Sequence, residues 1–233
     1  MRTLGVIGGM SWESSAVYYR LLNQGVAARL GGLHSAPLLL HSVDFAEVAA
    51  LQAQGDWVAA GRLLGAAAQG LQRAGAQGLV LATNTMHKVS AAIEAAVPGL
   101  PFLHIADVTA SALKAAGVQH ASLLGTRFTM EDDSIVRARL QQPGLAVSVP
   151  DSDDRTLMHR VIYEELCRGV VSDASRNAVV SLIERQAARG AQAVILGCTE
   201  IGLLIDSACS PLPVFDTTVL HAQAAVNWML EAP

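Results

Sequence analysis

The sequence predicts an α/β protein with two similar lobes, each a four-stranded, mostly parallel sheet flanked by helices. Short apolar runs of β character alternate with longer helical patterns along the chain, as parallel sheets covered on both faces require. The pattern restarts at Ala121, and residues 74–85 (AGAQGLVLATNT) match residues 189–200 (RGAQAVILGCTE) in register. We therefore expect a pseudo-two-fold duplication, with residues 1–103 and 216–233 in one lobe, residues 104–215 in the other, and the site between them.

The first half opens with an apolar run and a glycine turn, Gly8-Gly9, which lets the backbone approach a neighbour or a ligand closely. Ser11 or Ser14 is placed to cap the helix that follows, and Asp56 to cap a later one. A helix stops before Pro98. Strands are predicted at residues 4–7, 37–41, 78–82 and 101–104, and helices at residues 13–29, 45–54, after 56, 86–96 and 107–116.

The second half repeats this order with a turn at Gly125-Thr126 in place of Gly8-Gly9. One helix is expected to run without a break from this turn to about residue 140. Strands are predicted at residues 121–124, 145–149, 193–197 and 213–215, and the remaining helices at residues 155–168, 172–189 and 217–230.

Composition excludes several classes of protein. Among 233 residues the net charge is −4 and basic residues form no block, so nucleic acid is not expected as a partner. We find no secretory leader and no apolar run long enough to span a bilayer. The three cysteines lack CxxC spacing, and the histidines lack metal-ligand spacing. The prediction is a reduced, cytoplasmic protein without a metal, a membrane anchor or a disulfide framework.

Small polar residues follow several predicted strands at their carboxyl ends, where open α/β sheets bind ligands. They are Met10-Ser11, Thr83-Asn84-Thr85, Thr126 and Cys198-Thr199. Their hydroxyl, amide and backbone N–H donors suit a carboxylate. The predicted ligand is one small carboxylic acid.

Cys198 occupies the position that Thr83 occupies in the other copy of the repeat. A thiol where a strand meets a helix start is expected to favour the thiolate, because backbone N–H groups and the helix dipole stabilise negative charge. A hydroxyl and a thiol on opposite sides of one ligand suit proton removal on one face and delivery on the other. Cys167 and Cys209 are interpreted as packing residues.

Three motifs carry a resemblance to the aspartate/glutamate racemase superfamily, in particular its aspartate racemase branch. They are Gly8-Gly9-Met10-Ser11-Trp12-Glu13-Ser14, Thr83-Asn84-Thr85-Met86-His87 and Gly197-Cys198-Thr199-Glu200. The resemblance covers essentially the whole chain. It implies an isomerase that interconverts L- and D-amino acids without pyridoxal phosphate or any other cofactor, and a homodimer.

The resemblance also assigns site residues. Cys198 is the acid/base of the second lobe, and Thr83 stands where most members have Cys. A subset with Thr at this position is grouped with amino-acid racemases of wider specificity. The substrate-binding residues implied by the motifs and the strand ends are Met10, Gln52, Asn84, Thr85, Thr126, Thr199 and Glu200.

Arg168 is the first candidate for a cation that binds a second substrate carboxylate, and Arg20 and Arg127 are weaker ones. Two alternatives stay open. One is a single-cysteine isomerase or decarboxylase of the same superfamily, similar to maleate isomerase or arylmalonate decarboxylase. The other is a non-catalytic amino-acid-binding protein.

Overall fold

The computed structural model describes residues 1–131 and 133–231, and its contacts divide the chain into two compact units. Unit 1 comprises Met1–His104 and His221–Pro233, and unit 2 comprises Ile105–Leu220. The sequence had suggested divisions after residues 103 and 215. The contact boundaries follow His104 and Leu220, and the predicted lobe bounds stay a prediction. Each unit is described by itself.

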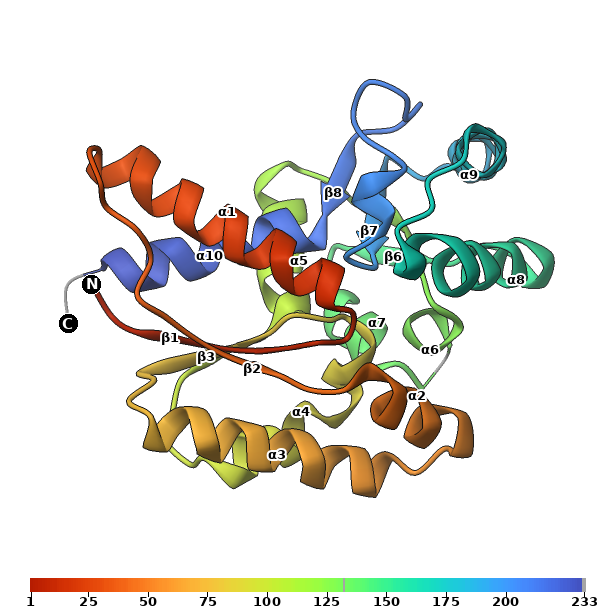
Figure 1. Cartoon of the computed structure of the whole chain (residues 1–233). Helices are drawn as coiled ribbons and strands as arrows, with labels where there is room; N and C mark the ends of the chain where they lie inside the picture. Colours follow the sequence, from red (N-terminus) through yellow and green to blue (C-terminus); the bar gives the residue numbers. More distant parts are fainter. Residues whose placement is uncertain (132, 232–233) are drawn as a thin grey trace. The chain divides into compact units, whose positions relative to one another are not determined.

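Unit 1 contains a parallel sheet of four strands in the order β2-β1-β3-β4. α1 and α10 cover one face of this sheet, and α3 and α4 cover the other (Figure 1). The strands are β1 (Leu4–Gly8), β2 (Leu38–Ser42), β3 (Gly78–Leu81) and β4 (Phe102–Leu103). The helices are α1 (Trp12–Leu30), α2 (Phe45–Gln54), α3 (Trp57–Arg73), the 3-10 helix η1 (Thr85–Val89), α4 (Ser90–Ala96) and α10 (Thr217–Leu230), whose first turn belongs to unit 2.

Unit 2 repeats the topology with strand order β6-β5-β7-β8, again all parallel. The predicted fold class is therefore confirmed: two four-stranded parallel sheets, each flanked by helices. The strands are β5 (His120–Gly125), β6 (Ala146–Ser148), β7 (Ala193–Gly197) and β8 (Val214–Asp216). The helices are α5 (Ile105–Ala115), α6 (Arg127–Met130), α7 (Ile135–Leu140), α8 (Ser152–Arg160), the π-helix η2 (Val161–Glu165), η3 (Leu166–Arg168), α9 (Asp173–Ala188) and η4 (Ile201–Leu203).

Three predicted helices are less regular than expected. The helix expected from Thr126 to residue 140 is two short helices, because Ser134 caps a new helix by accepting a hydrogen bond from the N–H of Arg137. The helix expected at residues 155–168 begins at Ser152 and passes through a π and a 3-10 segment. The helix expected at residues 86–96 opens as the 3-10 helix η1.

The turn after β1 depends on a glycine. Gly9 has a φ of +94°, and a Cβ atom there would lie 2.2 Å from the carbonyl oxygen of Val43. The N–H of Gly9 donates to Oγ of Ser15, 2.8 Å away, which fixes the turn against α1. Ser11 is the residue that caps α1. The sequence prediction of a tight glycine turn here is correct, and the close neighbour is the backbone that follows β2.

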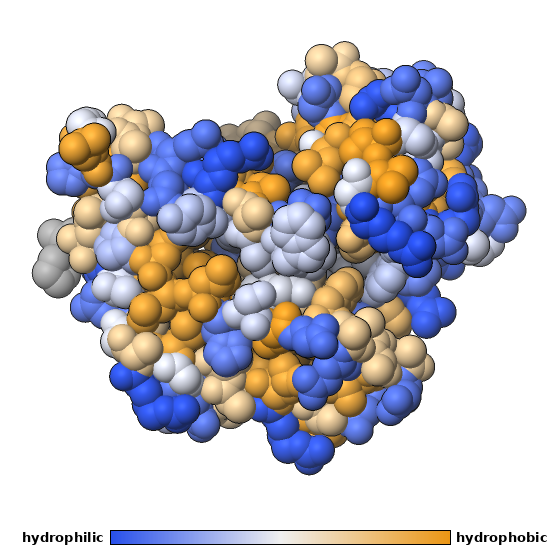
Figure 2. All heavy atoms as spheres, in the orientation of Figure 1, coloured by the Kyte–Doolittle hydropathy of each residue, from blue (hydrophilic) through white to orange (hydrophobic). Residues whose placement is uncertain are grey.

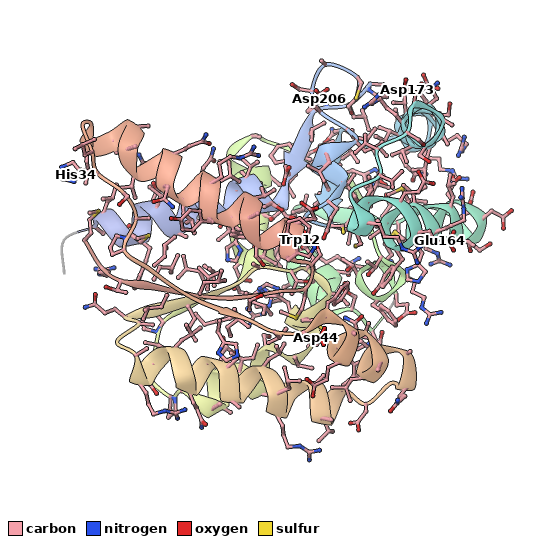
Figure 3. The ribbon with its side chains drawn as sticks, viewed as in Figure 1. Trp12, His34, Asp44, Glu164, Asp173 and Asp206 are labelled. Carbon is pink, nitrogen blue, oxygen red and sulfur yellow. The ribbon has the colours of Figure 1, made fainter. Side chains whose placement is uncertain are left out.

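The surface of unit 1 has an apolar area beside α1, over the part of the sheet where β2 lies (Figure 2). β2 is an edge strand, and Leu40 on it is exposed. Trp12 and Tyr19 on α1 are also exposed, and Figure 3 labels Trp12 at the start of this helix. Among the described residues, no helix has the length and apolar character needed to cross a lipid bilayer.

A buried hydrogen-bonded chain ties α1, α10 and β4 together in unit 1. His221 lies on α10, and its Nε2 is 2.8 Å from the carbonyl oxygen of Leu103. Because a carbonyl only accepts, Nε2 carries the proton and Nδ1 accepts from the hydroxyl of Tyr18, also 2.8 Å away. The His221 and Tyr18 side chains are fully buried, so each hydrogen bond satisfies groups that water cannot reach.

We predict that Tyr18→Phe destabilises the protein, because it leaves the Nδ1 lone pair of His221 buried without its donor. The expected loss in the free energy of unfolding is about 1–3 kcal/mol. The matched control is Tyr19→Phe, since Tyr19 is the next residue and is 60% exposed. Urea denaturation should separate the two variants, and equal stabilities would contradict the assigned hydrogen bond.

We further predict a loss of stability in acid that depends on His221. Burial lowers the pKa of His221 from 6.5 to about 4. The unfolded chain therefore binds a proton between these values that the folded chain does not, so stability falls as pH drops through this window. The contribution is on the order of 3 kcal/mol. Urea denaturation at both ends of the window should show a smaller loss in His221→Gln, and an NMR titration that protonates His221 above pH 6 would refute the prediction.

Candidate functional site

In unit 1 the predicted residues gather where β1 and β3 end. The two strands are parallel neighbours, and the N–H of Ala82 continues their ladder by donating to the carbonyl of Ile7. The hydroxyl of Ser14 donates to the carbonyl oxygen of Ala82, 2.9 Å away, which holds the start of α1 against the end of β3. Four predicted residues are buried at this edge: Met10, Thr83, Asn84 and Thr85.

A buried histidine holds the Thr83 turn by a hydrogen bond to its backbone. Nδ1 of His87 donates to the carbonyl oxygen of Thr83, 2.7 Å away. The ring of His87 is buried against His104, with 4.5 Å between centroids. Gln52 on α2 reaches the same turn, because its Nε2 lies 3.0 Å from Sδ of Met86. The structure thus brings Gln52 to the turn that the sequence motif identified.

In unit 2 the corresponding edge is formed by β5 and β7, with Gly125 paired to Gly197. A Cβ atom on Gly197 would lie 2.6 Å from the Leu123 side chain and 2.9 Å from the carbonyl oxygen of Leu124. Only glycine fits immediately before Cys198. Thr126 follows β5, and its Oγ1 is 3.2 Å from Oγ1 of Thr129.

The Cys198 thiol donates to a buried carboxylate. Sγ of Cys198 lies 3.0 Å from Oε2 of Glu200, and Oγ1 of Thr199 donates to the same oxygen at 2.5 Å. Cys198 is 8% exposed and Glu200 3% exposed. Sequence reasoning placed Glu200 among the substrate-binding residues, which stays a prediction. The contacts add a role that it did not foresee: Glu200 is positioned to exchange a proton with the thiol.

The expected thiolate at Cys198 is wrong for the structure as it stands. Burial raises the pKa of Cys198 well above its ordinary value, and the charge of Glu200 raises it further. The segment after Cys198 is a turn followed by η4, a 3-10 helix of three residues, so no long helix directs its dipole at the sulfur. At neutral pH Cys198 is a thiol, ready to donate a proton.

Cys167 packs against the core cluster that contains Cys198, as the sequence had suggested. Burial raises the pKa of its thiol, and the nearby charge of Glu200 raises it further. Tyr163 lies nearby, and its pKa is raised first by burial and then by Cys167 and Cys198. No spacing in the sequence joins Cys167 to Glu200, because the contact depends on the π and 3-10 turns after α8.

Arg168 follows Cys167 at the exposed end of η3. Its predicted role as the cation for a second carboxylate stays a prediction. The described residues contain no group of three or more His, Cys, Asp or Glu side chains arranged to hold a metal ion.

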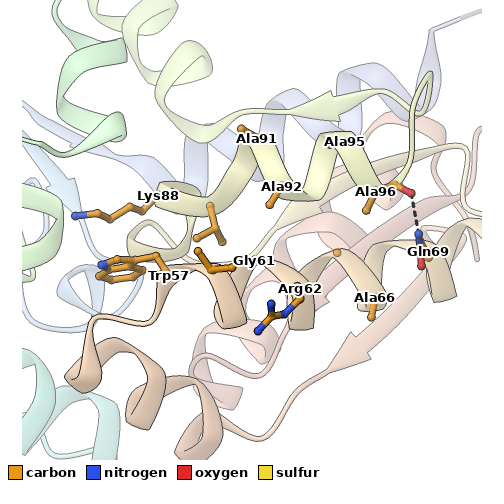
Figure 4. Close-up of a pocket in the computed structure, with 13 residues that line it drawn as sticks. Trp57, Gly61, Arg62, Ala66, Gln69, Lys88, Ala91, Ala92, Ala95 and Ala96 are labelled. Atoms are coloured by element: carbon orange, nitrogen blue, oxygen red, sulfur yellow. Dashed lines mark hydrogen bonds between the residues drawn. The ribbon is translucent and has the colours of Figure 1, made fainter.

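One large groove in unit 1 lies outside the predicted site. It has a volume of about 680 Å³ and runs between α3 and α4 (Figure 4). Small residues such as Gly61, Ala92 and Ala96 line it, and Nζ of Lys88 sits 4.8 Å from the centre of the Trp57 ring at one end. None of the predicted site residues lines this groove.

Residues 7–225 match the family model of Asp/Glu/hydantoin racemases. The chain belongs to this family. A Yersinia pestis protein described as a candidate Asp/Glu racemase is 52% identical, with a TM-score of 0.91 over 99% of this chain and 100% of that one. An aspartate racemase homologue from Pyrococcus horikoshii is 30% identical, with a TM-score of 0.83 over 99% of this chain and 100% of that one.

A more distant family structure supports the fold alone. Glutamate racemase from Francisella tularensis, solved with D-glutamate, is 12% identical, with a TM-score of 0.68 over 100% of this chain and 84% of that one. The family resemblance that the three motifs suggested is therefore confirmed. Family membership implies an isomerase acting on amino acids, and the substrate and the acid/base residues are taken up as proposals.

We predict that Glu200→Gln lowers the pKa of Cys198, because it removes the neighbouring negative charge and leaves burial and Cys167 as the causes of the shift. Alkylation by iodoacetamide, followed across pH by mass spectrometry of the Cys198 peptide, should reach its plateau at lower pH in this variant. Glu94→Gln is the control, since Glu94 is exposed on α4 in the other unit. An unchanged or higher pKa in Glu200→Gln would show that Glu200 does not act on the thiol.

Proposed function

We propose that this protein is a cofactor-independent amino-acid racemase, in which Cys198 and Thr83 exchange the α-proton on opposite faces of the substrate. The observation that carries the proposal is the 3.0 Å contact between the Cys198 thiol and the buried carboxylate of Glu200. A thiol in the core needs no such partner to pack, whereas a thiol that must gain and lose a proton does.

The proton balance on the Cys198 side can be written with residues of this chain alone. Glu200 takes the proton from Cys198, which leaves a thiolate and a neutral carboxylic acid. The thiolate then removes the α-proton of the substrate and becomes a thiol again, while the substrate becomes a carbanion. The first transfer moves one negative charge from oxygen to sulfur and changes no net charge, so it adds no buried charge to the site.

On the other side, the Thr83 hydroxyl donates a proton to the carbanion, which leaves an alkoxide. The alkoxide takes a proton from water, and the hydroxide formed takes the proton held by Glu200, so both side chains return to their starting states. The repeated topology supports this pairing. Thr83 follows β3 and Cys198 follows β7, and these strands hold equivalent places in the two sheets. A free alcohol is a far weaker acid than a thiol, so the two faces are unequal. Two enantiomers have equal free energy in water, so the equilibrium constant of racemisation is one. Unequal acid/base groups therefore make the rates from the L- and D-enantiomers differ without shifting that equilibrium.

The remaining predicted residues complete the proposal. Asn84, Thr85 and Thr199 hold the α-carboxylate with amide, hydroxyl and backbone N–H donors. Met10, Gln52 and Thr126 line the pocket. Arg168 binds a second carboxylate, which makes aspartate or a similar acidic amino acid the first substrate to test. A homodimer is the proposed assembly.

The decisive experiment follows loss of the α-hydrogen signal of L- and D-amino acids in D2O by NMR. Wild-type protein should exchange the α-proton and racemise at least one acidic amino acid, at different rates from the two enantiomers. Cys198→Ala should lower exchange by about 100-fold or more. Cys209→Ala is the control for loss of a thiol, because Cys209 hydrogen-bonds within its own turn around Asp206 and should leave exchange unchanged.

Two other outcomes would favour other functions. Exchange from one enantiomer without racemisation, unaffected by Thr83→Ala, would indicate chemistry by Cys198 alone, as in a single-cysteine isomerase or decarboxylase. Saturable binding without exchange, equal in Cys198→Ala and wild type, would indicate an amino-acid-binding protein. Equal exchange rates from both enantiomers would contradict the unequal roles of Cys198 and Thr83.

A further inference from the structure

A polar cavity lies in unit 2, between α6 and α8, which are neighbours in Figure 1. Its volume is about 450 Å³, and its lining differs sharply from the small apolar residues of the groove in unit 1. The described residues that line it are Arg127, Glu131, Ser152, Arg155, Thr156 and His159. Only Arg127 was considered for the predicted site, as a weaker candidate for the cation that binds a second carboxylate.

Both arginines in this cavity lack a carboxylate partner among the described residues. The guanidinium of Arg127 lies 4.7 Å from the centre of the Phe128 ring, a stacking contact that keeps it beside the cavity and leaves its N–H donors available. Arg155 is only partly exposed and has no ion pair with a described residue, whereas Arg160 and Arg185 pair with Glu165 and Asp154. Two unpaired guanidinium groups facing one cavity are unusual unless an anion joins them.

The net charge of the lining indicates how much negative charge the bound anion can carry. Among the described lining residues, two guanidinium groups and the Glu131 carboxylate leave one net positive charge, with His159 neutral. Burial and the charge of Arg127 lower the pKa of His159, while Glu164 opposes them. The hydroxyls of Ser152 and Thr156 add polar groups to the wall. This lining complements a small oxyanion of low charge.

We infer that the cavity between α6 and α8 binds a small anionic ligand through carboxylate or phosphate oxygens held by Arg127 and Arg155. The inference does not depend on the proposed racemase activity, and the ligand occupies a site separate from the substrate of that reaction.

The cavity also adjoins the Cys198 cluster. The ring of His159 packs against Tyr163, with 4.6 Å between centroids. Tyr163 is in turn close enough to Cys167, Cys198 and Arg127 for their charges to change its pKa. Nδ1 of His159 accepts a hydrogen bond from the backbone N–H of Arg127 at 3.4 Å. Because an accepting ring nitrogen carries no proton, the ring is neutral in this arrangement. A bound anion acts on this ring first, and His159 is therefore the natural reporter of binding.

The test uses the whole protein, with disodium succinate and inorganic phosphate as probes and sodium chloride at equal ionic strength as the blank. NMR follows the amide signals of residues 127–131 and 152–159, together with the His159 ring. We expect saturable shifts with at least one probe, and a rise in the pKa of His159 when it is bound. Tighter binding of succinate or of phosphate identifies which oxygen chemistry the site prefers.

Variants test whether the arginines hold the anion. Arg127→Gln and Arg155→Gln should each weaken binding about tenfold, as loss of a charge-assisted hydrogen bond implies. Arg160→Gln is the matched control: it lies on α8, removes the same charge, does not line the cavity and should bind like wild type. All three arginines are at the surface, and thermal melts will show that each variant is folded.

The inference is overturned by shifts that fail to saturate or that sodium chloride reproduces. It is equally overturned if Arg155→Gln binds as tightly as Arg160→Gln. Neither result would bear on α-proton exchange in D2O, so the two proposals fail independently.

Discussion

Parallel pairing of strands is the constraint on which the rest of the structure depends. Because β1 pairs with β3 and β5 with β7 in parallel, the loops after both strands of each pair leave the sheet at the same edge. Residues that are distant in the sequence, such as Met10 and Thr83, therefore follow strand ends at the same edge of the sheet. The same arrangement occurs in both units, so a single repeated topology prepares two sets of strand-end residues.

The two units use this shared plan for different chemistry. In unit 1 the strand-end turn is polar and uncharged, and His87 holds it by a hydrogen bond to the carbonyl of Thr83. In unit 2 the turn carries a carboxylate buried beside two thiols. A buried negative charge is costly, and hydrogen bonds from Cys198 and Thr199 offset much of that cost. Glu200 is therefore the residue that makes the second copy of the repeat chemically distinct from the first.

Sequence patterns predicted most of the fold, because the apolar runs and caps are local signals. The bounds of α2 and α10, the cap at Asp56 and the parallel strands all follow from such signals. The break between α6 and α7 was missed, since apolar periodicity continues across it while Ser134 begins a new helix. A capping serine inside a continuous pattern is a weak signal until the backbone around it is known.

The site was predictable in outline and less so in its electrostatics. Duplication identified Thr83 and Cys198 as equivalent, and the motifs identified their neighbours. The protonation of Cys198 was not predictable, because it depends on how deeply the sulfur is buried and on a carboxylate two residues away whose direction the sequence does not specify. The effect of Glu200 on Cys167 was missed for a similar reason: a π turn brings Cys167 near Glu200, and π turns leave no recognisable pattern in a single sequence.

The discontinuity of unit 1 has a consequence for how the chain is made. Its second apolar cluster includes Ala222, Val226 and Met229 of α10, packed on Leu4, Tyr18 and Leu22. Unit 2 is contiguous and is translated completely before these residues emerge from the ribosome. The amino-terminal half of the protein must therefore wait, with one face of its sheet covered by α1 alone, until the last helix is synthesised. During that interval the nascent chain exposes an apolar surface of the kind that molecular chaperones bind.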